Sequence, residues 1–263
     1  MQYFNARSFK SLCLKALCSL ALIATVQSSW AASSSVLEAE IAGLKQQFAG
    51  TPRDVSRAVH SLEWTGISNP ELFDDIATRL EAGYGGTSKY ALELNSWLVK
   101  SLALSGNEKY LPLMNTIAAR KDIKKLNRHT INSLENFAKF QRWNPIIAAN
   151  NETAKTPQEL NRLRTLNMLN ADDGELMERG AKIISRQYMQ EKELIDTINS
   201  VLLANYQTTD SDKKQAVEWM SKILGESGKH EYKTTLDKIA GDSSASRKIR
   251  NDAAKYSAIL GKS

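Results

Sequence analysis

One carboxylate in this chain has a neighbour that suits acid–base chemistry. Glu226 is followed directly by Ser227, and a protonated glutamate can serve as the general acid that cleaves a glycosidic bond. That role needs a pocket that raises the pKa of the carboxyl, and nothing in the sequence around Glu226 indicates one. Gly228 comes next and is typical of a helix end. We interpret Glu226 as a turn residue and keep a peptidoglycan-cleaving enzyme only as a remote alternative.

Metal and cofactor chemistry has little support among the residue types. Both cysteines, Cys13 and Cys18, lie in the first 31 residues. The three histidines, His60, His129 and His230, are far apart and show no H-x-x-x-H or H-E-x-x-H spacing. There is no G-x-S-x-G, no Walker motif and no G-x-G-x-x-G. The sequence therefore predicts no catalytic residue, no metal ligand and no cofactor.

Two clusters of basic residues have the charge to meet an anionic surface. The first comprises Lys124, Lys125 and Arg128, and the second comprises Arg247, Lys248 and Arg250. Clustered cations attract lipid headgroups, lipopolysaccharide or an acidic partner. A solvated helix face is the simpler interpretation of both clusters.

The first 31 residues have the pattern of an export signal. Three basic residues and no acid precede an uncharged run over residues 16–26, which is too short to cross a bilayer. Ser29 and Ala31 place small residues at the −3 and −1 positions, so we expect cleavage after Ala31 and a periplasmic location. Without this segment the formal net charge falls from +6 to +3, which does not favour nucleic acid as a partner. No later segment is apolar enough to span a membrane.

The rest of the chain matches itself when it is shifted by 122 residues. Residues 71–118 and 193–240 share 16 identities in 48 positions without a gap, against roughly three expected by chance. The aromatic matches are Tyr84 with Tyr206, Trp97 with Trp219, and Tyr110 with Tyr232. Because these residues recur in both copies, we interpret them as packing residues. Trp64 and Trp143 have no counterpart and are better candidates for binding a partner.

The hydrophobic periodicity is helical throughout. Leu72, Ile76 and Leu80 form one apolar stripe, and the same spacing recurs 122 residues later. Segments beginning at Thr51, Ser68 and Thr156 each combine a hydroxyl residue, an acid three positions later and a proline in the first turn, which predicts helix starts. We expect eleven or twelve helices, short loops and no substantial β-sheet.

Two segments, residues 102–134 and 224–257, resemble HEAT-like repeats. Each predicts a helix, a Ser-Gly turn, a Tyr-bearing helix ending in Ile-Ala and a basic start to the next helix. The chain looks like exported HEAT-like proteins of Gram-negative bacteria. The resemblance implies an all-α fold, an α-solenoid in which stacked helical hairpins form a superhelix of two tandem related halves. It also implies a curved binding surface and transfers no catalytic residue.

These expectations give a division of the chain and a function. The divisions are a signal peptide over 1–31, N-terminal repeats over 32–141, a connector with one helix over 142–172 and C-terminal repeats over 173–263. We predict a non-enzymatic periplasmic protein that binds a protein or peptide on its concave face. Association with an anionic envelope surface through the basic clusters is the alternative. The candidate contact residues are Trp64, Trp143, Lys124, Lys125, Arg128, Arg247, Lys248 and Arg250.

Overall fold

The computed structural model describes residues 36–262, and this part of the chain is built from helices and contains no strand. The all-α prediction is confirmed. A first helix covers residues 36–48. It is followed by α2 (Pro52–Leu62), α3 (Pro70–Gly83), α4 (Lys89–Leu104), η1 (Glu108–Tyr110), α5 (Leu111–Ala118), α6 (Lys124–Ala148), η2 (Asn151–Thr153), α7 (Pro157–Leu169), α8 (Gly174–Gln187), α9 (Lys192–Asn205), α10 (Ser211–Glu226), η3 (His230–Tyr232), α11 (Lys233–Gly241) and α12 (Arg247–Leu260). The export signal predicted for residues 1–31 lies outside the described residues.

The helix ends follow the expected local chemistry. Thr51 and Thr156 cap α2 and α7, each accepting a hydrogen bond from the backbone N–H three residues on. The helix start predicted at Ser68 differs by one residue, because Asn69 caps α3 instead. At the other end, α4 and α10 stop one residue before a Ser-Gly pair, and Gly106 and Gly228 take φ of +62° and +68°. Glycine accepts this left-handed conformation without a steric penalty.

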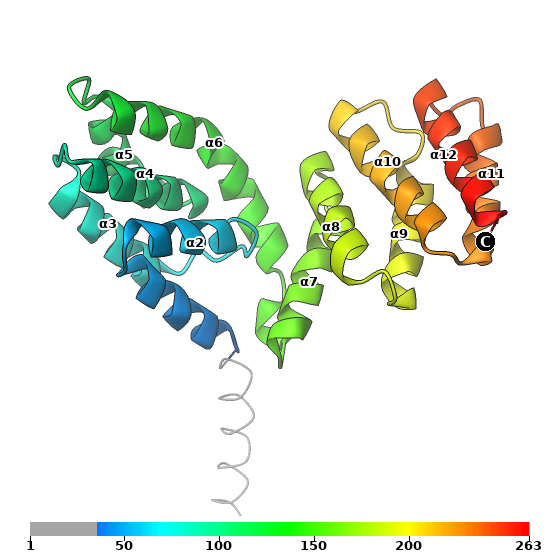
Figure 1. Cartoon of the computed structure of the whole chain (residues 1–263), viewed down its shortest axis with the longest axis horizontal. Helices are drawn as coiled ribbons and strands as arrows, with labels where there is room; N and C mark the ends of the chain where they lie inside the picture. Colours follow the sequence, from blue (N-terminus) through cyan, green and yellow to red (C-terminus); the bar gives the residue numbers. More distant parts are fainter. Residues whose placement is uncertain (1–35, 263) are drawn as a thin grey trace, which may run out of the picture.

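Consecutive helices pack against each other in pairs. α3 packs on α4, α5 on α6, α7 on α8, α9 on α10, and α11 on α12. The even-numbered helices also pack side by side. In the first group α4 lies between α2 and α6, and in the second group α10 lies between α8 and α12. Figure 1 shows these groups on either side of α7. One layer in each group therefore consists of even-numbered helices.

Two apolar cores hold the groups together, and they meet at α7 and α8. The first core extends from Leu44 to Leu176, and the second from Leu169 to Leu260. α7 also binds the first helix through Arg164, which is only 3% exposed and makes two hydrogen bonds to Glu40, of 2.9 and 2.7 Å. A buried guanidinium needs such a bidentate partner. α7 thus contacts elements of both groups.

The helix positions recur at the offset found in the sequence. α2 and α8 begin at residues 52 and 174, α3 and α9 at 70 and 192, and α4 and α10 at 89 and 211. α5 and α11 keep the same spacing, while α6 and α12 begin 123 residues apart. The first helix and α7 follow the series closely, with last residues 48 and 169. The helix assigned to the connector therefore stands where the second group needs a first helix.

The end of α6 differs from the sequence-based map. Trp143 and Pro145, placed there in a connector, lie in the last turns of α6, which runs on to Ala148. Proline costs this turn one backbone hydrogen bond. Packing maintains the helix nonetheless, since Trp143 and Ile147 are buried, and the Asn144 amide donates to the carbonyl oxygens of Leu104 and Ser105 at 2.8 and 3.0 Å.

Candidate functional site

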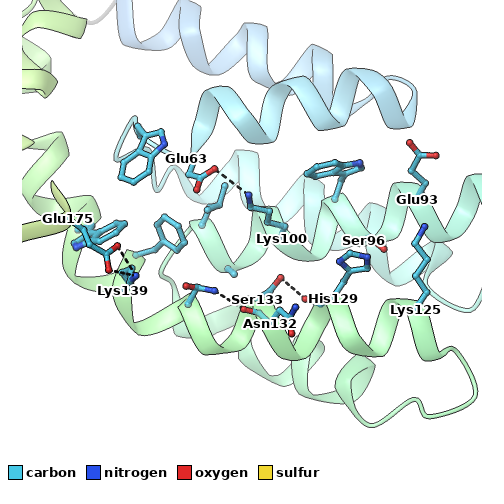
Figure 2. Close-up of a pocket in the computed structure, with 17 residues that line it drawn as sticks. Glu63, Glu93, Ser96, Lys100, Lys125, His129, Asn132, Ser133, Lys139 and Glu175 are labelled. Atoms are coloured by element: carbon cyan, nitrogen blue, oxygen red, sulfur yellow. Dashed lines mark hydrogen bonds and ion pairs between the residues drawn. The ribbon is translucent and has the colours of Figure 1, made fainter. Parts of the chain in front are cut away.

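A groove of about 570 Å³ lies along the even-numbered layer of the first group, and we name it groove one. It runs between α4 and α6, and the end of α2 and the start of α8 close one end (Figure 2). Its lining residues are Glu63, Trp64, Glu93, Ser96, Trp97, Lys100, Ala103, Leu104, Lys125, His129, Asn132, Ser133, Asn136, Lys139, Phe140, Trp143 and Glu175. Its volume exceeds those of two other cavities in residues 36–262, which are about 400 and 330 Å³.

Helical spacing explains how these side chains share one channel. On α4, the lining positions 93, 96, 97 and 100 follow the three- and four-residue steps of a single helix face. On α6, positions 125, 129, 132, 133 and 136 do the same. Ser96 and Ser133 are small, buried lining residues. The Ser96 hydroxyl donates to the backbone carbonyl of Leu92 at 2.6 Å, and the Ser133 hydroxyl donates to that of His129 at 2.8 Å, so both hydroxyls are satisfied within their own helices.

Aromatic rings close the end of groove one nearest to α8. Trp64 and Trp143 are stacked with centroids 5.5 Å apart, and Phe140 meets Trp143 edge-on at 5.6 Å. Arg179 of α8 lies over Trp64 at 4.7 Å, while Lys139 lies over Trp143 at 5.1 Å. Such cation–π contacts add to the apolar burial. The rings therefore connect the two groups as well as lining the groove.

The charges in groove one are partly neutralised by each other. Lys100 pairs with Glu63 at 3.3 Å, and Lys139 pairs with Glu175 at 2.7 Å. Figure 2 places the second pair at one end of the groove and the side chains of Glu93 and Lys125 at the other. Neither of these last two makes an ion pair with any residue from 36 to 262. They remain available to a ligand.

His129 adds a neutral polar group to the wall. Burial, and next the charges of Lys125 and Arg128, lower the pKa of its imidazole. The ring is therefore uncharged at neutral pH, with one nitrogen able to donate and the other able to accept a hydrogen bond.

A smaller groove of about 400 Å³, groove two, occupies the matching place in the second group. It is lined by Glu178, Gln215, Glu218, Trp219, Lys222, Lys248, Asp252 and Tyr256. Trp219, Lys222 and Lys248 stand where groove one has Trp97, Lys100 and Lys125. In groove two, however, Lys248 pairs with Glu218 at 2.6 Å, and both Lys182 and Lys222 lie over the Trp219 ring. Its polar groups are largely satisfied within the chain.

The structure separates the residues predicted to contact a partner. Trp64, Trp143 and Lys125 come together in groove one, although Trp143 is only 2% exposed, and Lys248 lines groove two. The others line neither groove. Lys124, Arg128 and Arg247 are exposed, and Arg250 is partly buried, with an Nε that has no partner among the described residues. The two basic clusters are therefore not equivalent free patches.

Sequence reasoning overlooked the repeated tryptophans as groove residues. Trp97 and Trp219 pack against the two apolar cores, as the sequence predicts, but both are only half-buried and each also lines a groove. The sequence does contain a sign of partial exposure at Trp97. The charged residues Glu93 and Lys100 flank it on the same helix face, which is unusual for an indole that is wholly inside a core. The shared surroundings of the two tryptophans agree with the repeat register.

Glu226 lines neither groove. It is the last residue of α10, and its half-exposed carboxylate faces Lys222 at 3.8 Å. Within residues 36–262, no three His, Cys, Asp or Glu side chains gather in a way that would hold a metal ion. In the same range, no helix has the length and apolarity needed to cross a membrane.

Comparison with family models, with curated proteins and with solved structures gives no significant match to this chain.

Proposed function

We propose that this chain is an exported, non-enzymatic α-solenoid of two tandem related halves that binds an extended peptide segment of a partner protein in groove one. The common offset of 122 residues between helix starts and the layer of even-numbered helices support the repeat architecture. The basic and apolar pattern of residues 1–31 supports export to the periplasm. The HEAT-like resemblance supports a surface that displays fixed side chains rather than a reaction centre.

The shape and polarity of groove one carry this proposal. The lining positions on α6 extend from Lys125 to Trp143, a helix length of about 27 Å, which matches about eight residues of extended chain. Asn132 and Asn136 lie along this length, both exposed. The Asn136 amide nitrogen donates to the Asn132 carbonyl at 2.9 Å, which leaves its side-chain oxygen as an acceptor. Such amides can pair with the N–H and C=O groups of an extended peptide.

Groove one is a better candidate than groove two because its groups are less occupied. Glu93 and Lys125 have no ion-pair partner in the described range, whereas Lys248 in groove two is paired with Glu218. The aromatic content also differs: groove one has three tryptophans and a phenylalanine, while groove two has one tryptophan and one tyrosine. Aromatic side chains supply much of the energy at peptide and protein interfaces.

A displayed library of eight-residue peptides tests the proposal. Peptides selected on the purified protein should bind with affinities that fall about tenfold or more in Trp97→Leu and in Asn132→Ala. Trp219→Leu is the matched control, since it changes the same position in groove two and should alter the affinity less than about twofold. The proposal is wrong if selected peptides bind Trp97→Leu as tightly as the unmodified protein.

A further inference from the structure

The two equivalent tryptophans differ in what covers their rings. In groove two, the ammonium groups of Lys222 and Lys182 lie 4.9 and 5.3 Å from the centroid of Trp219. In groove one, Trp97 makes an edge-to-face ring contact with His60, at 5.4 Å and 67°, and no cation of the described residues lies over its ring. Trp219 shows that an indole at this position accepts a cation from its surroundings.

Two residue differences account for the uncovered ring. Lys100 stands at the position of Lys222, but its ammonium is 3.3 Å from Glu63 and so is directed away from Trp97. The position equivalent to Glu63 in the second group is Ser185, which offers Lys222 no such partner. His60 occupies the position equivalent to Lys182 and is shorter than a lysine. Groove one has therefore lost both of the internal cations that groove two places on its tryptophan.

A carboxylate stands beside the uncovered ring. Glu93 precedes Trp97 by one helical turn, lines groove one, and makes no ion pair with any described residue. Its counterpart in groove two is the neutral Gln215. Lys100, a cation on the same helix face, is neutralised by Glu63. Lys125 faces the same end of the groove from α6, as Figure 2 shows, and would meet a carbonyl or carboxylate of the ligand.

We propose that Trp97 and Glu93 form a subsite for a cationic side chain, lysine or arginine, of the bound peptide. The ring supplies a cation–π contact, and the carboxylate supplies an ion pair on one side of the same group. This inference rests on the proposed function and specifies the chemistry of its ligand. In effect, the partner provides the cation that Lys222 and Lys182 provide within groove two.

Blocked pentapeptides of sequence Ala-Ala-Xaa-Ala-Ala, with Xaa as lysine or acetyl-lysine, provide the probe. Binding is followed by the NMR signals of the indole N–H groups, assigned with single tryptophan variants. The lysine peptide should shift the Trp97 signal and bind about fivefold more tightly than the acetyl-lysine peptide. Glu93→Gln should remove most of that preference without weakening the acetyl-lysine peptide.

Release of Lys100 gives a second, independent test. In Glu63→Ser, Lys100 becomes free to cover Trp97 as Lys222 covers Trp219, so binding of the lysine peptide should weaken about threefold or more. The double variant Glu63→Ser/Lys100→Gln has no competing cation and should recover the binding. The pair is part-buried, so the circular dichroism spectrum and the melting temperature of both variants are measured first to establish that they fold.

The results distinguish failure of the cation subsite from failure of the proposed peptide groove. Equal binding of both peptides at the Trp97 signal, or unchanged binding in Glu63→Ser, overturns the cation subsite while the proposed peptide groove stands. No shift of any groove-one indole signal by either peptide, together with failure of the library selection, overturns both.

Discussion

Trp143 donates its indole N–H to a carboxylate oxygen of Asp173 at 2.9 Å, and this bond joins the end of α6 to the start of α8. The other oxygen of Asp173 caps α8 by accepting from the backbone of Leu176 at 3.1 Å. One side chain therefore both begins a helix of the second group and binds the aromatic end of groove one. The relative position of the two groups depends on this contact.

Asp173→Asn should weaken either that junction or the helix cap, because asparagine has only one acceptor oxygen in its side chain. Its single remaining oxygen can serve either the Leu176 N–H or the indole, so one buried donor loses its partner. We expect a loss of about 1–2 kcal/mol in the free energy of unfolding, measured by urea titration. Asp172→Asn is the adjacent control, because Asp172 is exposed and its ion pair with Lys213 should contribute less than about 0.5 kcal/mol. Equal losses in the two variants would contradict the assigned role of Asp173.

Two equivalent tyrosines should contribute equally to stability. Tyr110 donates to Asp74 at 2.8 Å, and Tyr232 donates to Asp196 at 2.7 Å, each across 36 residues. Tyr110→Phe and Tyr232→Phe should each lower the free energy of unfolding by about 1.5 kcal/mol, since the acceptor is charged. Tyr90→Phe is the control and should have no effect, because Tyr90 is 56% exposed. A clear inequality between the two would contradict the equivalence of the groups.

The contribution of Tyr232 should depend on pH in the acid range. The hydrogen bond from Tyr232, and next the bond from Lys192, lower the pKa of Asp196 below its ordinary value of 3.8. A carboxyl with a lowered folded-state pKa stabilises the protein above the unfolded value, and this stabilisation is lost as the pH falls through the folded value. The difference in unfolding free energy between wild type and Tyr232→Phe should therefore be constant above about pH 5 and shrink below pH 3.8. A difference that does not change anywhere between pH 5 and the acid limit of folding would refute the carboxylate as the acceptor.

Gly106 and Gly228, two of the three left-handed glycines in the described residues, provide a pair that separates backbone strain from crowding. At Gly228 an added Cβ meets nothing within 4 Å, so Gly228→Ala should cost only the backbone term of about 1 kcal/mol. At Gly106 the same Cβ would lie 2.7 Å from the Gln141 backbone, so Gly106→Ala should cost about 3 kcal/mol as α4 is forced from α6. Thermal unfolding of both variants measures the difference. Similar melting temperatures would mean that α4 and α6 are not in close contact here.

Much of the fold could be predicted from the sequence because its signals are local. Helix caps at Thr51 and Thr156 and the left-handed Gly106 depend on a few adjacent residues, and all were correctly assigned. The continuation of α6 through Pro145 was not, because packing of Trp143 and Ile147 outweighs the local effect of proline.

Groove one was harder to predict because it depends on differences between the two helix groups. Sequence equivalence indicated that Trp97 and Trp219 have similar surroundings, but not that Glu63 draws Lys100 from one ring while Ser185 leaves Lys222 on the other. That contrast requires knowledge of side-chain directions across α2 and α4. Likewise, the sequence around Lys248 does not indicate that Lys248 pairs with Glu218 of another helix.

The basic residues outside the grooves give a test of the envelope-binding alternative. Lys124, Arg128 and Arg247 are exposed and line neither groove, so their reversal to glutamate leaves both grooves intact. We expect such a variant to bind selected peptides normally and to behave like wild type in sedimentation with anionic vesicles at low and physiological salt. Vesicle binding that is lost in the variant and is steeply weakened by salt would favour the envelope surface instead.

The position of a bound peptide tests the central proposal most directly. A selected eight-residue peptide that carries a nitroxide at one end broadens the NMR signals of nearby indole N–H groups. Binding in groove one should broaden the signals of Trp64 and Trp97 and leave that of Trp219 sharp. Broadening of the Trp219 signal alone, or of none of the three by a peptide that binds, would contradict the assignment of groove one as the binding site.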